Sequence, residues 1–356
     1  MQNRPRRATA LVAAMMAACA IAVAGGTATV RRIESEAVAG NMMGLTNVRP
    51  LAVYTPEGYE DTRRLYPVIY WIPGWKTPAS SEYVGALDDA IAKGWMPPVI
   101  AVTVDVREGV LMLNSPVFGN WADLLIDEVV PFIDREYRTI ASPEGRALMG
   151  HSTGGYAAML LPLLHPGIWS AVGLNDASVW GACDVAWRPR VVSDFSEYRS
   201  LTDPEQAWTQ VAIATSPDMD SPRRFDYPGR DGAPPSVDAA WDSRCLLSVQ
   251  MLREHGPALG KIDMVALTLP KDGAKTNRVH NLNMVQALRH VGIVPHVVSV
   301  RGSHGSHRRE RFVFLAVQVT SVMASPMFDT SDSRALTWAA MRRAPRPAGA
   351  RGAGVR

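Results

Sequence analysis

The chain has 356 residues, of which 47% are hydrophobic and 20% are charged. This composition supports one large folded domain or two small ones and excludes extended disorder. The formal net charge of +3 comes from the two ends, because residues 1–24 and 341–356 contain only arginines among their charged residues. The body between them carries 29 basic and 34 acidic residues, and this net charge of −5 argues against a nucleic-acid-binding protein.

The first 24 residues have the pattern of an export signal. Arginines at positions 4, 6 and 7 precede a run of small and apolar residues that ends in Ala22-Val23-Ala24. A basic start, a short apolar stretch and a small-x-small site predict cleavage after Ala24 and a periplasmic or secreted protein. A weaker signal, Ala17-Ala18-Cys19, would instead indicate a lipoprotein anchored at Cys19. No later stretch is long and apolar enough for a transmembrane helix, so we expect a mature chain without a membrane span.

Strands and helices alternate along the rest of the chain. Short apolar runs predict strands over residues 48–54, 66–72, 99–106, 146–149, 171–174, 262–269 and 295–300. Helical patterns cover residues 81–93, 121–137, 155–164, 281–291 and 308–324. This alternation predicts an α/β fold in which helices cover both faces of a mostly parallel sheet.

The alternation is interrupted once, over residues 178–261. This stretch is rich in Pro, Asp and Trp and is too long for a simple loop, so we predict an insertion with short helices. The sequence therefore predicts a single α/β domain over residues 25–340, with a disordered basic tail over residues 341–356.

Two cysteines, Cys183 and Cys245, remain after the predicted cleavage. An oxidising compartment would allow them to pair, but two buried thiols fit the sequence equally well. No Cys-x-x-Cys or His-x-x-x-His pattern is present, and the sequence predicts neither a metal site nor an organic cofactor.

The strongest chemical motif surrounds Ser152. Residues Gly150–Gly155 contain the pattern G-x-S-x-G between a predicted strand and a predicted helix. This strand–turn–helix context is the one that a nucleophile elbow requires, because its glycines relieve crowding at a strained turn. The helix that follows directs amide N–H groups toward the position at which an oxyanion develops. We therefore predict Ser152 as a nucleophile rather than a solvated serine in a glycine-rich turn.

A serine nucleophile needs a base later in the chain, and His304 is the best placed histidine. It lies in the loop Arg301-Gly-Ser-His304-Gly-Ser-His307, directly after the strand predicted over residues 295–300. Catalytic residues of α/β folds gather at such strand ends. His307 is a nearby alternative that would open the following helix, whereas His151 lies in the elbow and is expected to pack against its neighbours.

The carboxylate that orients the base has two candidates. Asp272 begins the loop after the strand predicted over residues 262–269, and it is our prediction for the acid. Asp176, at the end of the strand predicted over residues 171–174, is the alternative, because some hydrolases of this architecture take the acid one strand earlier. Either residue could also be an ordinary loop aspartate that accepts hydrogen bonds from turn amides.

The oxyanion needs two backbone donors. The strand predicted over residues 66–72 runs into Pro73-Gly74-Trp75, and Thr153 directly follows the nucleophile. We predict that the amides of Trp75 and Thr153 form the oxyanion hole.

From residue 49 to residue 323 the sequence resembles the esterase family of α/β-hydrolases that includes esterase D, feruloyl esterases, enterochelin-esterase-like proteins and secreted mycolyltransferases. The resemblance is carried, in order, by Val53–Tyr59, Tyr66–Tyr70, Phe118–Trp121, Val130–Asp134, Tyr137–Thr139, Gly150–Gly155 with His165-Pro166, and Gly302–His304 with Arg308 and Arg311. It implies Ser152 as nucleophile, His304 as base and Asp272 as acid. The chain departs from the family at Leu269, where a glycine usually precedes this acid.

Two classes of function fit these features. The first is an exported serine esterase that hydrolyses small-molecule or glycan-linked esters through an acyl-enzyme, or an acyltransferase that uses the same triad. The second is a non-catalytic exported binding protein on a decayed hydrolase fold, which the altered acid loop would explain. The sequence leaves the ester substrate and the oligomeric state open.

Overall fold

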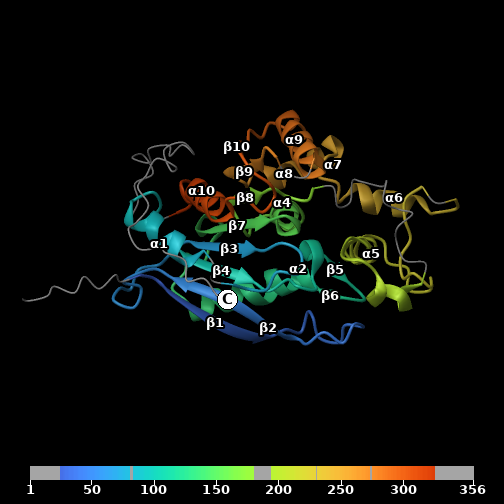
Figure 1. The fold of residues 1–356 in the computed structure, drawn as a ribbon, viewed down its shortest axis with the longest axis horizontal. Coiled ribbons are helices and arrows are strands. Elements are labelled where there is room, and N and C mark those ends of the chain that lie inside the picture. The colour runs from blue at the N-terminus through green and yellow to red at the C-terminus, as the bar shows by residue number, and fades with distance from the viewer. Residues whose placement is uncertain (1–24, 81–82, 180–193, 230, 273–274, 325–356) are drawn as a thin grey trace, which may run out of the picture.

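The computed structural model describes residues 25–80, 83–179, 194–229, 231–272 and 275–324 (Figure 1). Its centre is an eight-stranded sheet with the order β1-β2-β4-β3-β7-β8-β9-β10. The strands are β1 Thr27–Glu34, β2 Val48–Thr55, β3 Val68–Ile72, β4 Ile100–Val104, β7 Arg146–His151, β8 Ala171–Asn175, β9 Met264–Pro270 and β10 His296–Val300, and a separate small pair is formed by β5 Asn114–Ser115 and β6 Gly119–Asn120.

The sheet is mostly parallel, as the sequence predicts. All neighbours from β4 to β10 in the sheet order pair in parallel, whereas β2 runs antiparallel to both β1 and β4. The central strands are buried along their whole length, because helices cover both of their faces. Strand β1, at one edge, is largely exposed, and β10, at the other edge, is buried only at Val300.

Ten α-helices and several short helical turns belong to the described residues. The α-helices are α1 Val84–Ala92, α2 Trp121–Asp123, α3 Val130–Glu136, α4 Thr153–Leu164, α5 Asp203–Thr215, α6 Pro235–Asp242, α7 Val249–Glu254, α8 Gly256–Leu259, α9 Lys275–His290 and α10 Arg308–Thr320, and the turns are η1 Val110–Met112, η2 Leu124–Val129, η3 Pro143–Gly145 and η5 Phe195–Ser200. No helix of this part of the chain is long and apolar enough to cross a bilayer.

The hydrophobic core has one layer on each face of the sheet. On one face, Ile69 and Trp71 of β3 pack with helices α1 and α10. On the other face, Val68 and Tyr70 of the same strand pack with α3, α4 and α9 and with most of the insertion. Neighbouring β3 residues pack into different core layers because successive side chains of a strand point to opposite faces of the sheet.

Between β8 and β9 the chain forms η5, α5, α6, α7 and α8, so the short helices predicted for the insertion are present. Helices α5 and α6 lie on the side of the molecule toward which the β3 arrow points (Figure 1). Cys245, which precedes α7, is disulfide-bonded. Cys183, the predicted export signal and the predicted basic tail lie outside the described residues.

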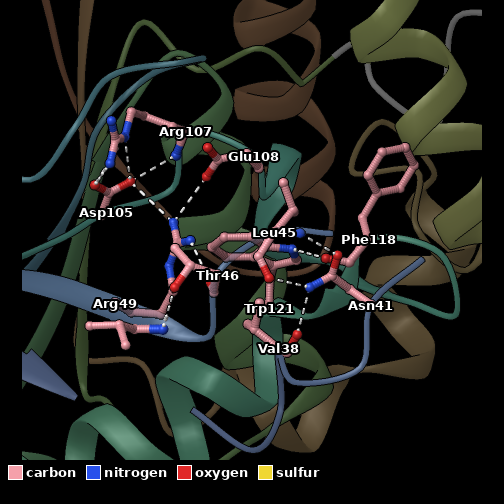
Figure 2. A network of polar contacts seen from close by, with 11 residues as sticks. Val38, Asn41, Leu45, Thr46, Arg49, Asp105, Arg107, Glu108, Phe118 and Trp121 are labelled. Carbon is pink, nitrogen blue, oxygen red and sulfur yellow. Dashed lines mark hydrogen bonds and ion pairs between the residues drawn. The ribbon is translucent and has the colours of Figure 1, made fainter. Parts of the chain in front are cut away.

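A buried polar network fixes the start of β2 to the loop after β4 (Figure 2). The Arg49 guanidinium forms ion pairs with Asp105, at 3.3 Å, and with Glu108, at 3.0 Å, and it lies 4.7 Å from the centre of the Trp121 ring. In the same view, Asn41 closes its own turn by donating to the carbonyls of Val38 and Leu45. These contacts hold the loop that follows β4 against the start of β2.

Candidate active site

Ser152 occupies a sharp turn between β7 and α4. Its backbone has φ of 55° and ψ of −118°, a conformation that is strained for any residue other than glycine. The turn needs a glycine two residues later, because a Cβ atom on Gly154 would lie 2.1 Å from the carbonyl oxygen of Ile72. The predicted elbow geometry is therefore present, and the strain places Ser152 at the carboxyl edge of the sheet.

Hydrogen bonds to the end of β8 hold Ser152 in place. Its amide donates to the carbonyl of Asn175 at 3.0 Å, and its carbonyl accepts from the amide of Ser178 at 2.9 Å. Its Oγ lies 3.2 Å from the Oγ of Ser178, a buried hydroxyl. Sequence reasoning missed Ser178, because a serine at the start of a long insertion has no distinguishing local pattern.

His304 is paired with Asp176. The Nδ1 of His304 lies 2.5 Å from the Oδ2 of Asp176, whose side chain is only 1% exposed. Asp176 directly follows β8 and has a positive φ of 46°, which turns its side chain away from the path of the strand. Because a carboxylate can only accept, Nδ1 carries the proton and Nε2 is the basic nitrogen of a neutral His304.

The ring of His304 also stacks on the ring of His151, with the centroids 4.5 Å apart and the planes 28° from parallel. Because His151 immediately precedes Ser152, this contact places the predicted base against the neighbour of the predicted nucleophile. The alternative, His307, is the N-cap of α10 and has a left-handed backbone with φ of 53°.

The sequence prediction that Asp272 is the partner of His304 is wrong. The Oδ2 of Asp272 accepts from the amide of Gly302 at 2.9 Å, and the Asp272 amide donates back to the Gly302 carbonyl at 3.1 Å. The loop after β10 then crosses the end of β9 and delivers His304 to β8, two strands away. Asp272 therefore closes the start of the loop, and the alternative residue, Asp176, contacts the ring.

Arg311 of α10 lies behind this pair. It is fully buried, and its Nη2 donates to the carbonyl oxygen of His304 at 2.5 Å. Burial lowers the pKa of Arg311, and the negative charge of Asp176 acts in the opposite direction. The buried guanidinium thus holds the loop that carries His304 and interacts electrostatically with the buried Asp176 carboxylate.

His151 stays neutral in this environment. Burial, followed by electrostatic interactions with His304 and Arg311, lowers the pKa of His151 to about 3. Its Nδ1 lies 3.0 Å from the carbonyl of Asn175, which can only accept, so Nδ1 carries the proton. His151 therefore provides a packing surface for His304 and does not titrate at neutral pH.

The two residues predicted for the oxyanion hole lie beside Ser152. A Cβ atom on Gly74 would be 3.3 Å from the Cβ of Ser152, so the loop that contains Trp75 touches the nucleophile. Thr153 is the first residue of α4, where an amide has no acceptor within the helix. Lys76, in the same loop, has a left-handed φ of 55° and pairs with Asp203 of the insertion at 2.5 Å.

Within the described residues, no group of three or more His, Cys, Asp or Glu side chains is arranged to hold a metal ion.

The sheet order, the elbow at Ser152 and the Asp176–His304 pair define an α/β-hydrolase fold with a candidate serine hydrolase site. Residues 44–226 match the family described as "Putative esterase", which is half of the chain, and the protein belongs to this Esterase family.

Two curated relatives are similar over shorter segments. An endo-1,4-beta-xylanase/feruloyl esterase of Xylanibacter ruminicola is 31% identical over 142 residues, which cover 36% of this chain and 19% of that protein. An esterase of Mycobacterium tuberculosis is 32% identical over 114 residues, which cover 30% of this chain and 24% of that protein. The matched segments thus span about a fifth to a quarter of the relatives' own length.

Solved structures share the fold over most of the chain. A ferulic acid esterase superposes with a TM-score of 0.62 at 17% identity, covering 85% of this chain and all of its own. The fluorophosphonate-binding serine hydrolase F of Staphylococcus aureus superposes with a TM-score of 0.56 at 12% identity, covering 83% of this chain and 98% of its own. At these identities the likeness concerns the fold.

Proposed function

We propose that this protein is a serine esterase that hydrolyses carboxylic esters through an acyl-enzyme, with Ser152 as nucleophile, His304 as general base and Asp176 as the acid. The observation that carries the proposal is the contact between the buried Asp176 and His304, at 2.5 Å, with the His304 ring stacked on the residue that precedes a strained Ser152. Membership of the Esterase family supports the same chemistry.

In this mechanism the Nε2 of His304 takes the proton of Ser152 as its Oγ attacks the ester carbonyl. The amides of Trp75 and Thr153 stabilise the oxyanion of the tetrahedral intermediate. The intermediate expels the alcohol, which receives the proton from His304, and leaves an acyl group on Ser152. A water molecule, deprotonated by His304, then attacks the acyl group and releases the carboxylic acid and free Ser152.

Asp176 has two tasks in this cycle. Its carboxylate accepts the Nδ1 proton and so fixes the tautomer in which Nε2 is the base. It also stabilises the imidazolium that forms while the proton resides on His304. A buried carboxylate does this better than an exposed one, because water screens it less.

We propose small-molecule or glycan-linked esters as the substrate class and the periplasm or the exterior of the cell as the location. A 31% identical relative carries feruloyl esterase in its name, which supports testing feruloyl esters first. The disulfide-bonded Cys245 and the signal-like residues 1–24 support an oxidising compartment.

Labelling with a fluorophosphonate tests the proposal directly, because such probes react with activated serines. We expect the protein to be labelled on the peptide that contains Ser152, as located by mass spectrometry, and Ser152→Ala to remain unlabelled. A folded wild-type protein that is not labelled would contradict the mechanism and would favour a binding protein.

Ser178 offers a milder test of the same site. Its hydroxyl is the partner of the Ser152 Oγ at 3.2 Å, so Ser178→Ala removes one hydrogen bond from the nucleophile. We expect kcat for a p-nitrophenyl ester to change by about 3- to 10-fold, which corresponds to the usual net value of one hydrogen bond, while labelling at Ser152 persists. An unchanged kcat would show that Ser178 does not position the nucleophile.

A further inference from the structure

The first described residues contact a carboxylate on the face of the sheet opposite to α4. Asp88 of α1 is half-buried, and its Oδ1 accepts from the amide of Gly26 at 2.8 Å and from the hydroxyl of Tyr54 at 2.7 Å. Burial, together with the neighbouring Asp88, raises the pKa of Tyr54, so its hydroxyl keeps its proton and remains a donor. The beginning of β1 is thus tied to α1 through Asp88.

The other carboxylate oxygen faces Gly25. A Cβ atom built on Gly25 would lie 3.0 Å from the Oδ2 of Asp88. The backbone nitrogen is bonded to the same Cα, so it lies within about 5.5 Å of that oxygen. Rotation about the backbone bonds of one terminal residue is enough to close this distance to that of an ion pair.

Both partners of Asp88 described above are neutral. No lysine, arginine or histidine among the described residues forms an ion pair with it, whereas its neighbour Asp89 pairs with Arg309 at 3.5 Å. Glu57, which acts on Tyr54, adds a further negative charge near this contact. A cation at Gly25 would therefore meet an uncompensated negative charge.

Gly26 shows that this contact is built into the fold. A Cβ atom at this position would lie 2.1 Å from the Tyr54 ring and 2.6 Å from the carbonyl oxygen of Thr55, so only glycine fits. Recognition of an export signal depends on small residues before the cleavage site. It does not require glycine at the second residue after that site. The requirement for glycine comes from the docking of this segment.

We propose that cleavage of the peptide bond between Ala24 and Gly25 creates a structural ion pair, in which the new α-ammonium group of Gly25 binds Asp88. A signal peptidase adds water across the bond, leaving a carboxylate on Ala24 and an amine on Gly25, which takes up a proton near neutral pH. Before cleavage, Gly25 offers Asp88 only a neutral amide. Processing therefore strengthens the attachment of edge strand β1 to the body.

Thermal melting of six proteins tests the pair: chains that begin at Gly25 or at Ala22, each as the wild type, with Asp88→Asn or with Asp89→Asn. A half-exposed ion pair of this kind should raise Tm by about 1 to 3 °C in the chain that begins at Gly25. We expect this difference to disappear with Asp88→Asn and to persist with the matched control Asp89→Asn. The proposal would be overturned if the Tm difference between the two chain starts were the same in the wild type and in Asp88→Asn, or if the wild type showed no such difference.

The intact mass of the exported protein provides the second readout. A mature chain that begins at Gly25 supports the proposal, whereas a lipid-modified chain that begins at Cys19, or an uncleaved chain, overturns it. Neither measurement uses esterase activity, so failure of the proposed function and failure of this inference are distinguishable.

Discussion

Replacing Asp176 by Asn is expected to lower kcat for ester hydrolysis by about 10³- to 10⁴-fold, while the fold is retained. An amide that donates to Nδ1 favours the tautomer with the proton on Nε2, and that nitrogen can then no longer accept the proton of Ser152. The substitution also removes the buried negative charge of Asp176 that stabilises the imidazolium of His304. Steady-state kinetics with a p-nitrophenyl ester, and circular dichroism to verify folding, provide the measurement.

Asp272→Asn is the matched control for this prediction, because both aspartates follow neighbouring strands and both accept a hydrogen bond from the loop that carries His304. Asp272 is exposed, and its contact is with the Gly302 amide at 2.9 Å. We expect its replacement to change kcat by less than about 10-fold, the value of one hydrogen bond. A large loss with Asp272→Asn and an active Asp176→Asn would reverse the assignment of the acid.

The second large effect is expected for Arg311→Met. This change removes a fully buried cation. The carboxylate of Asp176, whose side chain is 1% exposed, then loses its favourable interaction with that cation. Removing a buried charged donor and leaving its acceptor, the His304 carbonyl, without a partner costs about 1–3 kcal/mol of unfolding free energy. The loss of the hydrogen bond to the His304 carbonyl should also lower kcat more than it changes KM, because His304 loses its support.

Urea unfolding and kinetics of Arg311→Met measure both effects. Arg308→Met is the control, because Arg308 lies one turn earlier on α10 and is exposed. We expect the control to stay within about 0.5 kcal/mol of the wild type, as surface substitutions usually do. If Arg311→Met were as stable and as active as Arg308→Met, the guanidinium would have no role in holding the site.

The elbow conformation and the candidate base could be proposed from the sequence because both depend on local patterns. The glycines around Ser152 permit a turn that few other residues allow, and His304 lies in a Gly/Ser loop directly after a strand. The seven predicted strands were confirmed for a similar reason: runs such as Val68–Ile72 are apolar along their whole length.

The acid could not be decided from the sequence, because the choice depends on where the loop after β10 ends in space. Both aspartates follow a parallel strand, and only the path of residues 301–307 across β9 selects Asp176. Strand β1 was missed because it lies at the edge of the sheet, where its residues are exposed and need not be apolar.

The position of Asp176 directly after β8 divides the proposed catalytic triad into two unequal parts. Ser152 and Asp176 belong to one continuous β7–α4–β8 unit, in which the Ser152 amide is bonded to the end of β8. His304 alone is contributed by the C-terminal β10–α10 unit. A local opening of that terminal unit would therefore separate the base from an otherwise assembled nucleophile and acid. Such an opening would switch off hydrolysis reversibly, while the remainder of the core stays folded.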